Sequence, residues 1–229
     1  TGVLGAFNVA LAAWPIWKWV IVLLGYSYIA SVLPVWTLLQ PRDYINSLQL
    51  ITSLALIVLG LVVAAVIGGA PVDGARPELA LAAPMYESNW KAKGALVIFP
   101  FLFITIACGA ISGFHCLVSS GTSSKQLKNE QDARFVGYGS MLTEGFLATL
   151  VILACVAGLG LGFDGKLGAE AWDARYATWA DVKADAVGSF VFGAANFLKV
   201  LGLSAAVATA IMAVLVASFA GTTLDTACR

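Results

Sequence analysis

Long apolar runs separated by short polar connections make up most of the chain. A helix that crosses a membrane needs about 20 mostly apolar residues, because it rises about 1.5 Å per residue through a hydrocarbon core of about 30 Å. Lipid offers no partners for backbone polar groups, so each run is expected to be a helix with internal hydrogen bonds. The pattern predicts an all-α, polytopic transmembrane bundle with five full spans, over residues 17–38, 48–69, 95–118, 135–161 and 202–222.

Two shorter apolar stretches do not fit full spans. Residues 1–13 are typical of the end of an earlier span, so we expect residues 1–229 to be a single transmembrane domain and an internal piece of a larger protein. Residues 186–199 precede the last span and fit a short amphipathic or re-entrant helix that ends at Lys199. The pattern therefore adds one partial span and one helix that does not cross.

Two prolines lie where the first span meets the second. Pro34, late in the first span, lacks a backbone donor and is expected to kink that helix. Pro41 is expected to end the helix, which leaves residues 39–47 as a short connection before the second span.

The connections differ in length and charge. Residues 39–47 and 119–134 are short and basic, whereas residues 70–94 and 162–187 are longer and richer in acid. Connections rich in Lys and Arg stay in the cytoplasm. We therefore expect the short pair to be cytoplasmic and the long pair to be extracytoplasmic.

The long connections carry signals of local structure. Each contains an Asp-Gly dipeptide near its start, which is typical of a turn. The second then places Trp172, Tyr176 and Trp179 at near-helical spacing. This spacing predicts a short helix that lies on the membrane surface or caps the bundle.

Composition supports a membrane environment and narrows the function. Hydrophobic residues make up 60% of the chain and charged residues 11%, against about 45–50% and roughly 25% in soluble domains. The net charge is zero, which argues against nucleic acid as a partner, because phosphate binding needs a basic surface. The chain has no CxxC pair, a single histidine and no nucleotide, hydrolase or zinc signature, so we expect no metal, no other cofactor and no enzyme.

Glu144 is the acidic residue that lies deepest in a predicted span. It follows the start of the fourth span by about nine residues, or about 13 Å at helical rise. An ionisable side chain at that depth is costly unless it is paired, solvated or protonated, and it marks a substrate or proton pathway. Glu144 is therefore our leading candidate for proton coupling. The alternatives are a structural hydrogen bond or ion pair, or a position nearer the interface.

His115 lies in the run CGAISGFHCLVSSGTSSKQL, residues 108–127. Gly113 and the serines after His115 are expected to interrupt or end the third span, and broken helices in transporters line substrate sites. An imidazole titrates near pH 6.5, so His115 is a second proton-coupling candidate. The alternatives are a satisfied core histidine and a helix-packing face of small residues. The candidate substrate contacts, whose backbone and hydroxyl groups suit a small anion, are Ser112, Gly113, His115, Ser119, Ser120, Thr122 and Ser123.

Polar residues at two other span ends are candidate ligand contacts. Arg42 offers a forked donor for a carboxylate, although its neighbour Asp43 makes a simple anchoring ion pair the alternative. Thr222, Thr223 and Asp225 follow the last span and provide oxygen ligands that suit a cation or a proton. A solvated Asp225 at the membrane edge is the alternative there.

Four long blocks follow one another across nearly the whole chain: YSYIASVLPVWTLLQPRDYINSLQL, FPFLFITIACGAISGFHCLVSSGTSSKQL, DARFVGYGSMLTEG and SFAGTTLDTACR. They resemble the carbon starvation protein A (CstA) family of bacterial inner-membrane transporters. Ser123 stands where the family favours Thr, which preserves the hydroxyl. The resemblance implies a longer polytopic protein of the amino acid–polyamine–organocation superfamily, with inverted repeats and broken helices around a midplane site.

The resemblance also implies a function. Members of the family take up peptides or pyruvate, and the pyruvate carriers are similar to proton symporters. We therefore expect secondary active uptake of a small carboxylate or of short peptides across the inner membrane, as a response to carbon starvation. The coupling ion is expected to be a proton, with sodium as the alternative. A membrane nutrient sensor or scaffold subunit that does not transport is the competing hypothesis.

Overall fold

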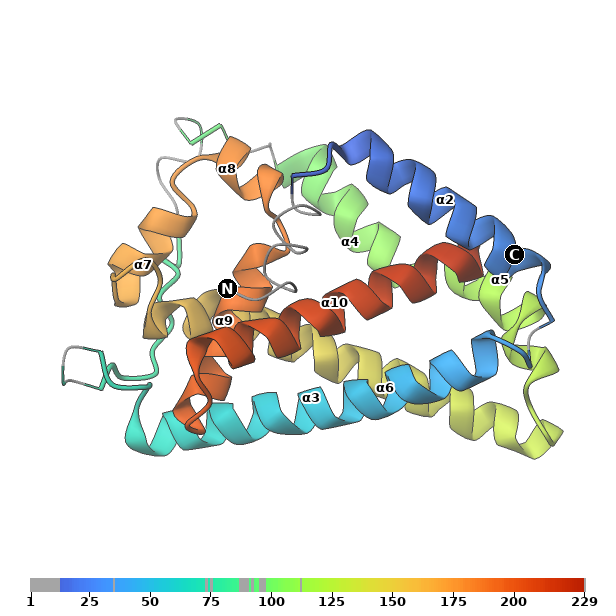
Figure 1. The fold of residues 1–229 in the computed structure, drawn as a ribbon. Coiled ribbons are helices and arrows are strands. Elements are labelled where there is room, and N and C mark those ends of the chain that lie inside the picture. The colour runs from blue at the N-terminus through green and yellow to red at the C-terminus, as the bar shows by residue number, and fades with distance from the viewer. Residues whose placement is uncertain are drawn as a thin grey trace.

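The computed structural model describes residues 13–228 except 35, 73, 75, 87–90, 92, 95–97 and 112. Within these residues the fold is all-helical, as predicted, and Phe163 and Lys166 form an isolated β-bridge. The predicted partial span at residues 1–13 lies almost wholly outside the described residues. Figure 1 shows long helices lying lengthwise, with the connections gathered at two opposite ends of the bundle.

Three stretches of the described chain are long and apolar enough to cross a membrane. They match the second, fourth and fifth predicted spans and confirm them. The middle stretch begins as a regular α-helix, α6, and closes in a π turn, η3, and a 3₁₀ turn, η4. The elements are α3 (Leu39–Ile67), α6 (Glu130–Leu153), η3 (Ala154–Gly158), η4 (Leu159–Leu161) and α10 (Ala205–Ala227).

The first predicted span is shorter than expected, because its prolines act differently. Helix α2 (Ile16–Val32) has 17 residues and ends where Leu33 turns extended, at φ −69° and ψ 147°. The residue before a proline disfavours the helical region, so Pro34 ends the helix instead of kinking it. Pro41 lies in the first turn of α3, where its missing N–H has no acceptor to lose. The predicted connection at residues 39–47 was therefore wrong, because these residues form the first turns of α3.

The third predicted span, residues 95–118, is broken. Phe99 is extended before Pro100 (φ −107°, ψ 131°), and Ile111 leaves the helical region (φ −130°, ψ 44°). The predicted interruption near Gly113 is thereby confirmed, but a single full span here was wrong. The pieces are η1 (Ile98–Leu102), α4 (Phe103–Ala110), α5 (Gly113–Gly121) and the 3₁₀ turn η2 (Ser123–Lys125).

The short and long connections lie at opposite ends, as the predicted alternation requires. Figure 1 places the turn between α2 and α3 and the turn between α5 and α6 at one end, and the chain around α7 and α8 at the other. The connection predicted at residues 119–134 shrinks to residues 122–129, because α5 continues to Gly121 and α6 begins at Glu130.

The connection at residues 162–187 folds into two short helices, α7 (Gly168–Arg175) and α8 (Trp179–Ala184). Its Asp-Gly dipeptide forms a tight turn with positive φ at both residues, 50° at Asp164 and 74° at Gly165, as predicted. Arg175 is buried and donates from Nε to Ser189 Oγ over 2.8 Å. This bond fastens the end of α7 to the first turn of α9, so the connection caps the bundle.

Helix α9 (Gly188–Val200) forms the centre of the packed core. It contacts α3, η3 and α10 and, in Figure 1, runs across the ends of the longer helices. Residues 193–198 are all buried. The helix is short, as predicted, and its burial fits the re-entrant alternative better than an amphipathic surface helix.

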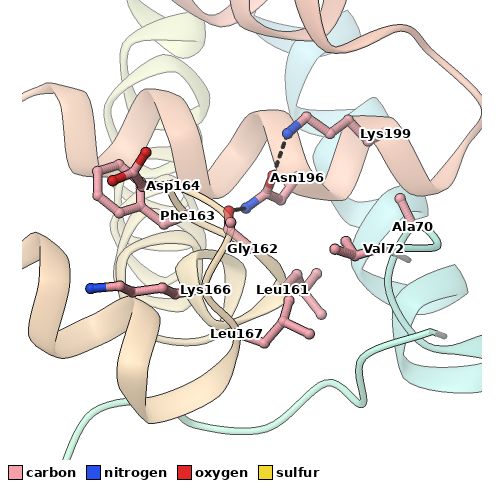
Figure 2. Close-up of a pocket in the computed structure, with 11 residues that line it drawn as sticks. Ala70, Val72, Leu161, Gly162, Phe163, Asp164, Lys166, Leu167, Asn196 and Lys199 are labelled. Atoms are coloured by element: carbon pink, nitrogen blue, oxygen red, sulfur yellow. Dashed lines mark hydrogen bonds between the residues drawn. The ribbon is translucent and has the colours of Figure 1, made fainter. Parts of the chain in front are cut away.

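Asn196 of α9 completes the irregular end of the fourth span. Its Nδ2 donates to the backbone oxygens of Gly158 and Gly162, over 2.8 Å each. Its Oδ1 accepts a 2.8 Å hydrogen bond from Lys199 Nζ, drawn as the dashed line in Figure 2. Carbonyls released where a helix becomes irregular need such partners when water is excluded. The Asn196 side chain therefore binds backbone carbonyls at the irregular end of the fourth span.

The close approach of α9 to the fourth span requires glycine, which gives a first prediction. A Cβ on Gly193 would lie 1.9 Å from the backbone oxygen of Ala154. We expect Gly193→Ala to lower the free energy of unfolding by about 3 kcal/mol, because backbone cannot yield as a flexible side chain does. Thermal unfolding of the purified protein in detergent measures the loss.

Gly137→Ala on α6 is the matched control, since a Cβ there meets nothing within 4 Å. Alanine is about 1 kcal/mol better than glycine in a helix, so this variant should be as stable as the native protein or more so. Equal melting temperatures for Gly193→Ala and the native protein would contradict the close contact.

Candidate functional site

The two residues predicted to couple protons are neighbours in space. His115 lies on α5 and Glu144 on α6, and His115 Nε2 is 3.7 Å from Glu144 Oε1. This distance is within ion-pair range but too long for a direct hydrogen bond. Both side chains are more than 60% exposed within this chain. An imidazole and a carboxylate so placed can exchange a proton directly after a small movement, or through one water.

The break before α5 positions this pair. Helix α4 closes with a hydrogen bond from Ile111 N to Ala107 O, and the chain then begins a new helix at Gly113. His115 therefore lies in the first turn of a short helix, where it faces α6. Gly113 lies where a broken helix was predicted, whereas Ser112 lies outside the described residues.

The hydroxyl groups after His115 are turned back onto their own helix. Ser119 Oγ donates to Cys116 O over 2.9 Å, and Ser120 Oγ donates to Leu117 O over 3.1 Å. Their donors are thereby used, and their oxygens remain as acceptors. The expectation that these serines offer donors to a small anion does not fit this arrangement. Thr122 and Ser123 are half-buried at the start of the turn η2.

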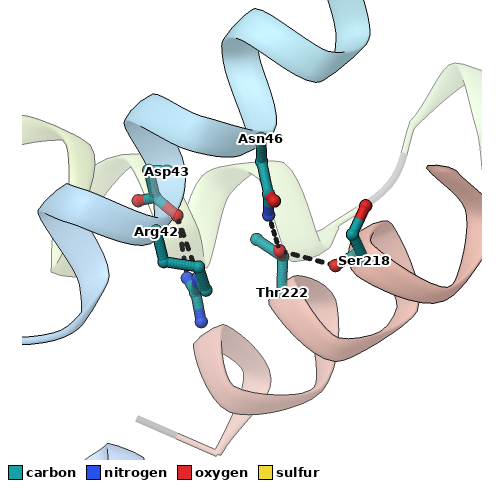
Figure 3. A network of polar contacts seen from close by, with 5 residues as sticks. All are labelled: Arg42, Asp43, Asn46, Ser218 and Thr222. Carbon is teal, nitrogen blue, oxygen red and sulfur yellow. Dashed lines mark hydrogen bonds and ion pairs between the residues drawn. The ribbon is translucent and has the colours of Figure 1, made fainter. Parts of the chain in front are cut away.

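Arg42 and Thr222, predicted as separate ligand contacts, lie at the same helix contact (Figure 3). Arg42 pairs with its neighbour Asp43, with 2.8 Å between Nη2 and Oδ1, so the anchoring alternative describes it better. Its guanidinium points toward the last turn of α10 in Figure 3. A cation is favourable there, because helix C-termini carry partial negative charge.

Thr222 joins α10 to α3. The buried Asn46 donates from Nδ2 to Thr222 Oγ1, which in turn donates to Ser218 O over 2.8 Å. Both the donor and an acceptor site of this hydroxyl are thus engaged in helix packing, which leaves it poorly placed for an ion. Thr223 is exposed, and the side chain of Asp225 lies outside the described residues.

A cavity that the sequence did not predict lies at the opposite end of the bundle. It has a volume of about 210 Å³ and is lined by Ala70, Val72, residues 161–167, Asn196 and Lys199 (Figure 2). We call it the Lys199 cavity. Asn196 within the apolar run of α9, three residues before a lysine, is the signal that could have pointed to it.

Comparison with known proteins identifies the family. The model of the carbon starvation protein CstA family matches residues 6–164, more than half of the chain. The chain belongs to the CstA family. It is similar to the pyruvate/proton symporter BtsT of Escherichia coli, with 47% identity over 135 residues, or 58% of this chain and 17% of that protein. No solved structure matches the chain significantly.

The peptide transporters named CstA are similarly related. The protein from Escherichia coli is 41% identical over 151 residues, and that from Helicobacter pylori is 43% identical over 152 residues. These matches cover 62% and 65% of this chain but only 19% of each relative. This CstA-family chain thus matches less than a fifth of the length of each of these relatives. The relatives' names and the long apolar helices of this chain indicate a membrane protein.

The family match divides the candidate residues. It includes Arg42, the break at Gly113, His115 and Glu144, and it ends before α9 and α10 begin. The His115–Glu144 pair therefore lies within the part that this chain shares with the family model, and the Lys199 side of the cavity lies beyond it.

The contact between Asn46 and Thr222 gives a second prediction. In a double-mutant cycle of Asn46→Ala and Thr222→Val, the two losses of unfolding free energy should not add. We expect a coupling of about 0.5–1.5 kcal/mol, the usual contribution of one hydrogen bond. Thermal unfolding of the four proteins in detergent measures it.

Thr209→Val provides the control, because the Thr209 hydroxyl donates to Ala205 O within its own helix over 2.8 Å. Its effect should add to that of Asn46→Ala. If the losses of unfolding free energy from Asn46→Ala and Thr222→Val also added without coupling, the hydrogen bond between α3 and α10 would be absent in the protein.

Proposed function

We propose that the protein is a proton-coupled secondary transporter, and that this chain carries part of its proton path. It would import a small carboxylate such as pyruvate, or short peptides, across the bacterial inner membrane during carbon starvation. The relatives' names support the substrate classes. The observation that carries the role of this chain is the 3.7 Å approach of His115 Nε2 to Glu144 Oε1.

The pair joins a broken helix to a continuous one. His115 lies just after the break between α4 and α5, and Glu144 lies near the middle of the apolar stretch Glu130–Leu161. A short helix can shift relative to a long neighbour at lower cost than two continuous spans can. A proton held between the two side chains would therefore respond to movement of the broken segment, which is the linkage that a symporter needs.

Sodium coupling is less well supported by the side chains near this pair. Hard cations need several oxygen ligands, and His115 places a ring nitrogen beside the carboxylate of Glu144. An imidazole beside a carboxylate suits a proton instead. In the orientation that we propose, the end that carries residues 122–129 faces the cytoplasm, and residues 70–94 and 162–187 face outward.

Uptake by proteoliposomes tests the proposal. We expect the wild-type protein to accumulate labelled pyruvate or dipeptide when a proton gradient is imposed, and to return it chemically unchanged. Glu144→Gln should abolish accumulation, so that internal and external concentrations become equal, because a neutral amide cannot take up the coupled proton. Exchange of internal for external substrate without a gradient should persist, because it needs no net proton movement.

His115→Gln should shift the pH profile of gradient-driven uptake, since it removes the imidazole beside Glu144. Glu130→Gln, at the exposed start of the same helix, is the matched control and should transport normally. Undiminished proton-driven accumulation by Glu144→Gln would reject the assigned role of Glu144. Substrate binding without accumulation under either a proton or a sodium gradient would favour the sensor or scaffold alternative.

A further inference from the structure

We infer that the Lys199 cavity is a binding site for a small monocarboxylate, separate from the His115–Glu144 pair. The cavity lies where η4 meets the end of α9, beside the turn at Asp164 and Gly165 (Figure 2). The inference does not depend on transport, because a carboxylate could occupy this cavity whether or not it is carried across the membrane.

Lys199 supplies the charge that an anion would meet. Its Nζ donates to Asn196 Oδ1 over 2.8 Å. An ammonium group has three donors. Within the described part of the chain, Lys199 uses one of them in its hydrogen bond to Asn196, so two donors remain for a ligand. Burial lowers the pKa of Lys199, since an ammonium loses solvation there. A bound carboxylate would offset that loss.

Asn196 holds the ammonium in place. Both protons of its amide are used on the carbonyls of Gly158 and Gly162, so its oxygen can only face Lys199. Asn196 is itself 4% exposed and cannot rotate without breaking three hydrogen bonds. The cation is thus fixed by the core and is not a freely moving surface lysine, and preorganised charge binds anions better than mobile charge does.

The remaining walls restrict the kind of anion. Ala70, Val72, Leu161 and Leu167 give the cavity an apolar side. A ligand with one anionic end and a short apolar body would match both sides. The volume of about 210 Å³ is below the 300–1,000 Å³ usual for drug-sized ligands, so the ligand must be small.

The charges on the lining favour one negative charge over two. Lys199 is the half-buried charged residue of the lining, whereas Lys166 and Asp164 are exposed and contribute little. A dicarboxylate or phosphate would carry a second charge that Lys199 cannot match, and it would leave the apolar wall uncovered. A monocarboxylate matches both the single charge of Lys199 and the apolar wall of the cavity.

Protection of Lys199 from acylation tests the site in the native protein. The purified protein in detergent is treated with an amine-acylating reagent, and peptides are quantified by mass spectrometry with and without propionate. We expect propionate to slow labelling of Lys199 several-fold and to leave Lys166 unchanged. Succinate and inorganic phosphate at equal ionic strength should protect Lys199 less. Equal labelling of Lys199 with and without propionate would overturn the inference, as would equal protection of both lysines.

Binding of labelled propionate to variants provides a second measure. Lys199→Gln should weaken binding about tenfold or more, as expected for loss of a charge-assisted hydrogen bond. Lys199→Arg should restore much of the affinity, and Lys166→Gln should change it less than about twofold, because exposed charges contribute little. Unchanged affinity in Lys199→Gln would reject the site. Both measurements use no gradient, so failure of transport leaves them unaffected.

Discussion

The structure depends on one constraint, which is that backbone groups released from an interrupted helix need new partners inside the protein. The fourth span closes in π and 3₁₀ turns, and Asn196 bonds the carbonyls of Gly158 and Gly162 there. This bonding requires α9 to approach the span closely, which glycine at 158 and 193 allows. Helices α3 and α10 also pack against α9.

The bundle consequently has two different parts. Around α9, side chains are buried and polar groups are bonded, so this region forms a frame. Around α4 and α5, a second helix break presents His115 to Glu144 with side chains that are largely exposed within the chain. A packed support for one broken helix, beside a second broken helix with exposed side chains, fits the transport role that we propose.

Much of this organisation could be predicted from apolar run length, because lipid leaves few alternatives to a helix. The break near Gly113 was also predictable from composition. The structural roles of Pro34 and Pro41 were predicted wrongly. A proline fits either the end or the first turn of a helix, and the sequence alone does not distinguish these two positions. The pairing of His115 with Glu144 and the role of Asn196 depend on contacts between residues 29 or more positions apart, and spacing along one helix carries no signal of such contacts.

Hydrogen–deuterium exchange of the protein in lipid nanodiscs, with and without pyruvate or dipeptide, tests this division most directly. We predict slow exchange over residues 154–162 and 193–198 that substrate does not alter. Residues 108–122 should exchange faster, because the helix is broken there, and should become protected when substrate binds. Equal protection of both regions, with no response of residues 108–122 to either substrate, would contradict the account.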